Sequence, residues 1–169
     1  MKRVSVIISS FNSVRFLEPA IDSILQQSYS DFELIIIDDA STDGSKEILA
    51  SFAAADSRII PIYNRENIGL TKNLNIAISL SKGEYIARMD ADDIALPERL
   101  EKQVIFLDTH KEIDVIGSAA IDIDESGKKI QLRKSPKTHD EIIALLPKAN
   151  PMTHSTVMFR KDKYKKIGF

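Results

Sequence analysis

The sequence contains no cysteine and carries no large excess of charge of either sign. The absence of cysteine excludes disulfide bonds, thiolate metal sites and cysteine nucleophiles. The formal net charge of −2 leaves no basic excess that would favour nucleic acid or an anionic membrane. There is also no signal peptide and no apolar run near 18 residues. We therefore expect a cytoplasmic protein with no transmembrane segment in this chain and no nucleic-acid partner.

Two common phosphate-binding motifs are missing as well. The chain has neither G-x-x-x-x-G-K-[ST] nor G-x-G-x-x-G, the glycine-rich loops that hold phosphates through backbone N–H groups. A nucleotide site in this chain would therefore depend on carboxylates and a metal ion rather than on a glycine cradle.

The composition, with 43% apolar and 28% charged residues over 169 positions, is typical of one soluble α/β domain. Runs rich in valine and isoleucine at 3–9, 32–38, 58–63 and 84–89 predict buried strands. Between them, apolar residues recur at helical spacing. This alternation predicts right-handed βαβ units and a mainly parallel sheet.

The pattern changes after about residue 112. The residues on either side of "ESGK" (125–128) predict a hairpin, and Thr138 with Glu141 forms a capping box for a short helix at 138–146. One more strand is predicted at 155–161. No linker separates these elements from the rest, so we predict a single domain over residues 1–169.

Polar clusters follow three of the first four predicted strands. These are "SSFNS" (9–13), "DDASTDGS" (38–45) and "DADD" (90–93). Parallel strands place their carboxyl ends at one edge of the sheet, and ligands of open α/β sheets bind outside that edge. The sequence therefore predicts a ligand site built from all three clusters.

Asp90 and Asp92 are candidates for a metal site. Two carboxylates one residue apart can converge on Mg²⁺ or Mn²⁺, which take oxygen ligands that include substrate phosphates. The alternative is a solvated acidic turn in which Asp92 or Asp93 caps the following helix, with Pro97 in its first turn. These residues alone leave both interpretations open.

Asp38 and Asp39 follow the second predicted strand. Their carboxylates are suited to accept hydrogen bonds from a ribose hydroxyl or from the edge of a base. The alternative is a turn whose purpose is to cap the next helix through Ser41 or Asp43.

The stretch "NIGLTKNLN" (67–75) is a third candidate. Gly69 permits close approach of the backbone to a ligand before a helix starts, and Lys72 can meet a phosphate. A plain loop with a solvated lysine is the alternative.

Taken together, these stretches resemble a known family. "VSVIISSFNSVRFLEPAIDSILQQSYSDFELIIIDDASTDGS" (4–45) and "NIGLTKNLNIAISLSKGEYIARMDADDIALPERL" (67–100) resemble the two opening blocks of family 2 glycosyltransferases. "NPMTHSTVMFRK" (150–161) is similar to a later block of bacterial members. The resemblance implies the GT-A fold, a Rossmann-like, mainly parallel sheet flanked by helices, here with a C-terminal hairpin and edge strand.

The resemblance also implies roles for single residues. Asp39 would contact the base, typically uracil. Asp92 would bind the metal ion directly, with Asp90 near the ribose and the metal shell, and Asp93 would be a supporting or acceptor-side carboxylate. The nucleotide-binding residues implied in this way are Ser9, Phe11, Asn12, Asp39, Gly69, Lys72, Asp90 and Ala91.

The implied reaction is the transfer of a sugar, with inversion, from a nucleoside-diphosphate sugar to an acceptor hydroxyl. The donor would be a UDP-sugar, the cofactor Mn²⁺ or Mg²⁺, and the acceptor a glycan or a lipid-linked glycan of the bacterial cell envelope. A membrane-associated acceptor would place the protein at the inner face of the membrane.

The sequence departs from the family in one respect. The family's catalytic base is an acidic residue beyond the block at 150–161, and the chain stops at "KYKKIGF" without it. We therefore expect a domain truncated at its C-terminal end. Within the chain, His154 and Asp93 are the weak candidates for the base, and His154 has the alternative role of ordering the "NPMTH" loop. The competing function is a nucleotide-sugar-binding fragment without turnover.

Two other classes of protein fit less well. A phospho-receiver domain carries its acid pair after strand one, whereas the pair here follows strand two. A nucleotidyltransferase would have a glycine-rich loop after strand one, where this chain has "SSFNS".

Overall fold

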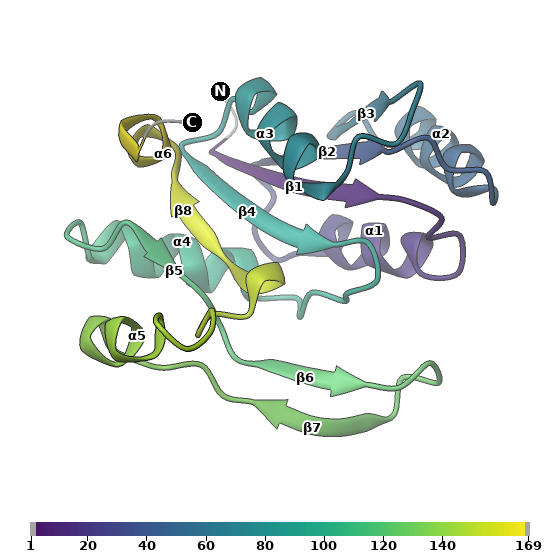
Figure 1. The fold of residues 1–169 in the computed structure, drawn as a ribbon. Coiled ribbons are helices and arrows are strands. Elements are labelled where there is room, and N and C mark those ends of the chain that lie inside the picture. The colour runs from purple at the N-terminus through teal and green to yellow at the C-terminus, as the bar shows by residue number, and fades with distance from the viewer. Residues whose placement is uncertain (1–2, 168–169) are drawn as a thin grey trace.

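The computed structural model describes residues 3–167 (Figure 1). Strands and helices alternate through the first two thirds of the chain. They are β1 (Val4–Ser10), α1 (Leu17–Leu25), β2 (Phe32–Asp38), α2 (Ser45–Ala55), β3 (Ile59–Tyr63), α3 (Leu70–Leu80), β4 (Tyr85–Asp90) and α4 (Arg99–Thr109). The remaining elements are β5 (Val115–Ile116), β6 (Ala120–Ile123), β7 (Lys129–Arg133), α5 (His139–Leu145), the 3₁₀ turn η1 (His154–Thr156), β8 (Met158–Arg160) and α6 (Lys161–Ile167).

The central sheet has the strand order β3-β2-β1-β4-β8-β5. Strands β1 to β4 are parallel, β8 runs antiparallel to β4, and β5 runs antiparallel to β8. This arrangement confirms the prediction of a mainly parallel sheet, with β8 and β5 completing one edge.

Helices cover both faces of this sheet. On one face, α1, α2 and α4 pack against alternate strand residues that include Val6 and Leu34. On the other face, α3 packs against Ile7 and Ile35, and Phe159 of β8 completes this smaller cluster. Every residue of β2 is buried, which explains why the apolar residues at 34–37 are consecutive rather than alternating with polar ones.

Two predicted boundaries are wrong. Helix α4 begins at Arg99, so Pro97 lies in the preceding turn, and neither Asp92 nor Asp93 is close enough in sequence to cap it. Strand β8 covers only Met158–Arg160, because His154–Thr156 form a 3₁₀ turn. The predicted hairpin and the capping box of the short helix are both present.

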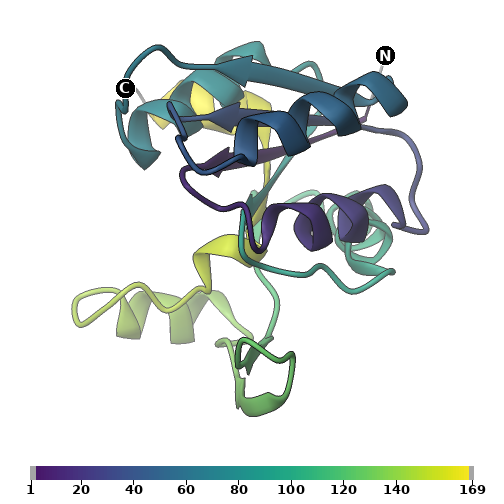
Figure 2. The same ribbon diagram turned by 90° about the vertical axis from the view of Figure 1, so that its right-hand side faces the viewer.

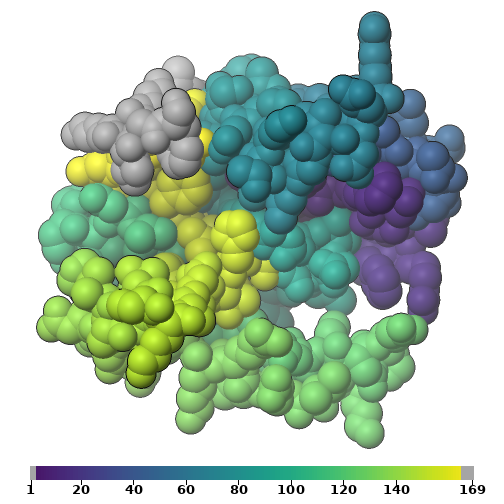
Figure 3. Space-filling model, viewed as in Figure 1, coloured from purple at the N-terminus to yellow at the C-terminus, as the bar shows by residue number. Residues whose placement is uncertain are grey.

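The hairpin and α5 lie apart from the central sheet. Strands β6 and β7 form a separate two-stranded sheet, and the view in Figure 2 shows the hairpin and α5 projecting from the body of the domain. Open space separates part of the hairpin from that body in Figure 3. Within residues 3–167, the structure contains no helix of the length and apolarity that a bilayer span requires.

Candidate functional site

The three polar clusters lie at one edge of the sheet, as the sequence predicts. Ser10 of β1 is in register with Asp38 of β2, and Ser9 is in register with Asp90 of β4. The carboxyl ends of these strands are therefore neighbours, and the loops that follow them meet above the sheet.

Asp39 is the centre of a hydrogen-bond network at this edge. Its side chain is almost completely buried, with 2% exposed. Oδ1 accepts hydrogen bonds from Asn64 Nδ2 (2.7 Å) and from the Ile68 N–H (3.0 Å), and Oδ2 accepts one from the Gly69 N–H (2.9 Å). Burial raises the pKa of this carboxyl, but the hydrogen bonds from Ile68 and Asn64 outweigh it, so the net pKa is lowered. The side chain of Asn73 also acts as a hydrogen-bond donor to this carboxyl, so the carboxylate is held on every side within the protein.

Asn73 extends the network to β1. This helical residue is fully buried, its Oδ1 accepts from Asn64 Nδ2 (2.8 Å), and its Nδ2 donates to Ser9 Oγ (3.0 Å). Neither asparagine was predicted from the sequence to belong to the site. A signal was present for Asn73, because it lies three residues after Leu70 and four before Ala77, on the apolar side of its helix.

A second set of contacts ties the loop after β1 to the loop after β2. Asn12 has a left-handed backbone (φ 49°), which asparagine tolerates better than most residues. Its N–H donates to Ser41 Oγ (3.0 Å), and its Oδ1 accepts from the Thr42 N–H (2.9 Å). Asp43 accepts from the Val14 N–H (3.0 Å). These bonds hold the two loops in one arrangement before any ligand binds.

Gly69 adopts a backbone conformation that favours glycine. Its φ is +86°, and a Cβ at this position would have no protein atom within 4 Å. The requirement for glycine within the protein is therefore conformational rather than steric. Its approach to a ligand stays a prediction.

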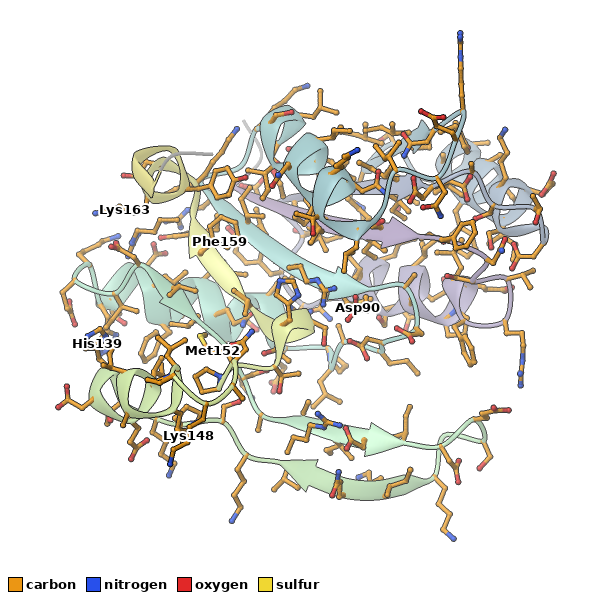
Figure 4. The ribbon with its side chains drawn as sticks, in the orientation of Figure 1. Asp90, His139, Lys148, Met152, Phe159 and Lys163 are labelled. Carbon is orange, nitrogen blue, oxygen red and sulfur yellow. The ribbon has the colours of Figure 1, made fainter. Side chains whose placement is uncertain are left out.

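The acidic cluster after β4 is partly neutralised within the protein. Arg88 Nη1 donates to Asp90 Oδ2 (2.6 Å), and Arg88 Nη2 donates to Asp90 Oδ1. Figure 4 shows Asp90 where β4 ends. Arg88 is 4% exposed and its Nε has no hydrogen-bond partner among the described residues, which is unusual for a buried guanidinium. This residue was not predicted from the sequence, although a charged residue inside "YIARM" was a signal.

The other two carboxylates differ in their surroundings. Asp92 is exposed and forms no ion pair with the residues described. Asp93 is half-buried and lies near Arg99, whose pKa is lowered to about 10 by burial while the charge of Asp93 opposes that shift. Arg99 thus stays protonated at neutral pH, and Asp92 is the least compensated carboxylate of the cluster.

His154 lies close to this cluster in space. Burial lowers the pKa of its imidazole, the positive charge of Arg88 adds to this shift, and the negative charge of Asp90 opposes it. The ring is therefore mainly neutral at pH 7. It also lines a groove of ≈ 660 Å³ between α3 and β8, together with Leu70, Leu74 and Phe159.

The remaining predicted residues differ in their exposure. Phe11 is half exposed, Lys72 is exposed in the first turn of α3, and Ala91 is buried. The structure thus joins Ser9, Asp39 and Gly69 in one network, and Asn12 contacts the loop after β2 in a second set of bonds. The roles of all the predicted residues toward a ligand stay predictions.

The carboxylates at this edge are suited to a divalent metal ion that binds together with a ligand. Among residues 3–167, no three side chains of His, Asp or Glu converge into a metal cage. Mg²⁺ and similar ions do not need such a cage, because they are commonly held by one or two carboxylates with water and substrate phosphates. The exposed carboxylate of Asp92 meets that requirement.

Comparison with known proteins shows what this chain is similar to. The family model described as "Glycosyl transferase family 2" matches residues 5–168. The chain is 42% identical over 166 residues to the putative glycosyltransferase EpsE of Bacillus subtilis, covering 98% of the chain and 59% of EpsE. It is 40% identical over 162 residues to the O-antigen biosynthesis glycosyltransferase WbnJ of Escherichia coli, covering 94% of the chain and 62% of WbnJ. The chain thus spans about three fifths of these relatives.

Solved structures show the same fold at low identity. The structure of Staphylococcus aureus TarS (residues 1–349) with UDP superposes with a TM-score of 0.75 at 21% identity, over 98% of this chain and 48% of that one. The mannosyltransferase PcManGT of Pyrobaculum calidifontis, solved with GDP-Man and Mn²⁺, gives a TM-score of 0.73 at 20% identity over 98% and 46% of the two chains. These likenesses confirm the fold class, the GT-A type.

Proposed function

The chain belongs to glycosyltransferase family 2, and from this premise we propose that it forms the donor-binding part of an inverting, metal-dependent enzyme. The enzyme would move a sugar from a UDP-sugar to a hydroxyl group of a glycan or glycolipid acceptor. The family membership rests on a model match over residues 5–168 and on relatives named as glycosyltransferases.

One observation carries the proposal: the buried network of Asp39 and the acidic cluster of Asp90 and Asp92 lie at the same edge of the sheet. A nucleoside-diphosphate sugar presents two chemically different parts, a base with hydrogen-bonding edges and a negatively charged diphosphate. The two sets of side chains match those two ends.

At the base end, the ionised carboxylate of Asp39 would accept a hydrogen bond from an N–H donor of a pyrimidine ring, in exchange for or beside one of its present donors. Hydrogen bonds from Asn64 and from the N–H groups of Ile68 and Gly69 hold the carboxylate in place and ionised. Uracil offers such a donor, and the TarS structure was solved with UDP. The nucleotide-binding residues that we propose are Ser9, Phe11, Asn12, Asp39, Gly69, Lys72, Asp90 and Ala91.

At the diphosphate end, Asp92 would hold Mn²⁺ or Mg²⁺, with Asp90 close to the ribose and the ion. Such an ion neutralises the charge that gathers on a departing diphosphate, an effect worth several kcal/mol. The residues of this chain orient the diphosphate and keep the acidic edge in position.

Inversion needs a base that takes the proton from the acceptor hydroxyl, a step that contributes about 10²–10⁴-fold in rate. Of the two candidates in this chain, His154 fits better than Asp93. His154 lines the groove between α3 and β8 and is close enough to Asp90 to feel its charge, whereas Asp93 lies near the positive charge of Arg99.

The acceptor is proposed from the relatives. One relative is named as an amylovoran biosynthesis glycosyltransferase and another as an O-antigen biosynthesis glycosyltransferase, names that point to polysaccharide acceptors. We propose an acceptor of that class, used by a cytoplasmic protein at the inner face of the membrane.

The test is thermal unfolding of the protein with UDP, with and without Mn²⁺, against ADP and GDP. A ligand at ~100 times its dissociation constant stabilises by about 2.7 kcal/mol. We expect stabilisation by UDP that requires Mn²⁺ and that Asp92→Asn abolishes. Asp31→Asn changes an exposed aspartate just before β2, at the opposite edge of the sheet, and should leave the effect intact.

Two outcomes would contradict the proposal. One is the absence of stabilisation by any nucleotide, and the other is unchanged Mn²⁺-dependent stabilisation in Asp92→Asn. Formation of UDP from a UDP-sugar in the presence of an acceptor would distinguish turnover from binding alone.

A further inference from the structure

Arg88 is a buried cation that the proposed function leaves without a role. It lies in β4 between Ala87 and Met89, both buried apolar residues, and is itself 4% exposed. Burial of a charge is costly unless the charge is paired, and its guanidinium directs two hydrogen bonds at the single carboxylate of Asp90. The role of Arg88 therefore lies in its effect on the carboxylate of Asp90.

Both backbone polar groups of Arg88 form hydrogen bonds. Its N–H donates to the Val157 carbonyl oxygen (2.9 Å), and its own carbonyl oxygen accepts from Arg99 Nη2 (2.7 Å). A paired Arg–carboxylate contact adds geometric specificity to its charge. Arg88 thus fixes both the position and the orientation of the Asp90 carboxylate.

The charges of the acidic cluster are consequently unequal. Arg88 compensates Asp90, and the charge of Arg99 lies near Asp93, whereas Asp92 is exposed without an ion pair among the residues described. A divalent cation that approaches this edge meets a free carboxylate at Asp92 but a carboxylate already bound to a cation at Asp90.

We propose, on the basis of the proposed function, that Arg88 is a positioning residue that competes with the divalent cation for Asp90. In the nucleotide-free protein, Asp92 then supplies the carboxylate for the ion, and Arg88 keeps the affinity for the bare ion low. The ion is held firmly only when a diphosphate supplies further oxygen ligands. Because Arg88 occupies Asp90 and only Asp92 is free for the ion, metal binding depends on the nucleotide.

The competition can be measured with Mn²⁺ alone, by following free Mn²⁺ with electron paramagnetic resonance during a titration without nucleotide. Arg88→Met removes the cation and frees Asp90, so we expect the affinity for Mn²⁺ to rise by roughly tenfold. A residue with only a structural role would not produce a gain in affinity. If Arg88→Met does not fold, Arg88→Gln removes the charge and keeps a donor for Asp90.

Two further variants make the assignment specific. Asp90→Asn should change Mn²⁺ affinity less than about threefold in the wild-type background, but should remove the gain when combined with Arg88→Met. Arg58→Met is the matched control, because Arg58, just before β3, also pairs with an aspartate two residues away, Asp56 (2.7 Å from Nη2). It should leave Mn²⁺ affinity unchanged.

Unchanged or weaker Mn²⁺ binding in a folded Arg88 variant would overturn the inference. Wild-type protein that fails to bind UDP with Mn²⁺ would instead overturn the proposed function. The two failures are distinguishable because the first concerns the variant alone and the second the wild type.

Discussion

The edge of the sheet at β1, β2 and β4 and the segment of residues 117–150 are built in opposite ways. At the edge, side chains such as Asp39 and Asn73 are buried and their polar atoms are paired. In the later segment, every residue of β7 is exposed and no residue of α5 is buried. Ile130 and Leu132 of the hairpin are more than half exposed.

This difference shows which part of the molecule carries the stability of the fold. Apolar burial beneath the edge holds the loops of the site in one arrangement, so a ligand at this edge would meet a preformed set of donors and acceptors. The hairpin and α5 contribute little buried area, and their order rests on local bonds such as the capping box. Substitutions in the two regions should therefore differ in their effects, which should decrease from the core to α5.

The largest effect should come from the core below the site. Ile36→Ala removes part of a fully buried side chain in β2 and should lower the free energy of unfolding by about 2–5 kcal/mol. Ile130→Ala, at a hairpin residue that is 66% exposed, should change it by less than about 0.5 kcal/mol. Urea unfolding measures the free energy of unfolding of both variants. A loss for Ile130→Ala as large as that for Ile36→Ala would show that the hairpin side chain is buried rather than exposed.

A smaller effect should come from the charge of Asp39. Its pKa is lower in the folded protein than the ordinary value of 3.8, so its stabilising contribution is present above that pH and is lost as the pH falls through the folded pKa. Asp39→Asn should therefore cost about 1.5–3 kcal/mol at pH 7, the range for hydrogen bonds to a charged group, and progressively less below pH 3.8.

Thermal unfolding of the wild type and of Asp39→Asn, measured between pH 7 and about pH 2.5, tests this pH dependence. The control is Asp122→Asn in the hairpin, where Asp122 pairs with Arg133 at the surface (2.7 Å). Surface ion pairs contribute little, so this variant should unfold like the wild type. A loss from Asp39→Asn that does not depend on pH would contradict the role of the charge.

The smallest effect should come from the cap of α5. The hydroxyl of Thr138 accepts from the Glu141 N–H (3.3 Å), and Thr138→Ala should destabilise the helix locally by about 1 kcal/mol. Faster amide hydrogen exchange of residues 139–146 would report this loss, with little change in overall unfolding because α5 buries no side chain. Thr109→Ala, at the end of α4, should leave the exchange of α5 unchanged; a large shift in global unfolding for Thr138→Ala would mean that α5 belongs to the core.

Much of the fold could be predicted because its elements have strong local signals. The apolar run of β2 and the helical spacing of Leu70, Leu74 and Ala77 identify strand and helix without reference to the rest of the chain. The first and last residues of the elements were harder to predict. Pro97 is compatible with a first helical turn by its own φ, but in the structure the Pro97 carbonyl oxygen accepts from the Ser28 N–H (2.9 Å), a contact that the local sequence does not encode.

The candidate site was predicted in its location but not in its internal hydrogen bonds. Polar clusters after parallel strands must share an edge, so Asp39, Asp90 and Asp92 could be grouped from the sequence. Asn64 and Arg88 could not be assigned their partners, because an asparagine in a loop and an arginine in a strand have many potential contacts.

The sequence by itself determined which segments are strands, which are helices, and which edge of the sheet gathers the acidic and polar residues, because these depend on local periodicity and chain direction. Only the tertiary structure decided that Asp39 is held by Asn64 and Gly69 and that Asp90 is held by Arg88. The physical reason is that a hydrogen bond needs its two atoms within about 3 Å. For residues as far apart as Ser9 and Asn73, strand order and helix packing alone bring them that close.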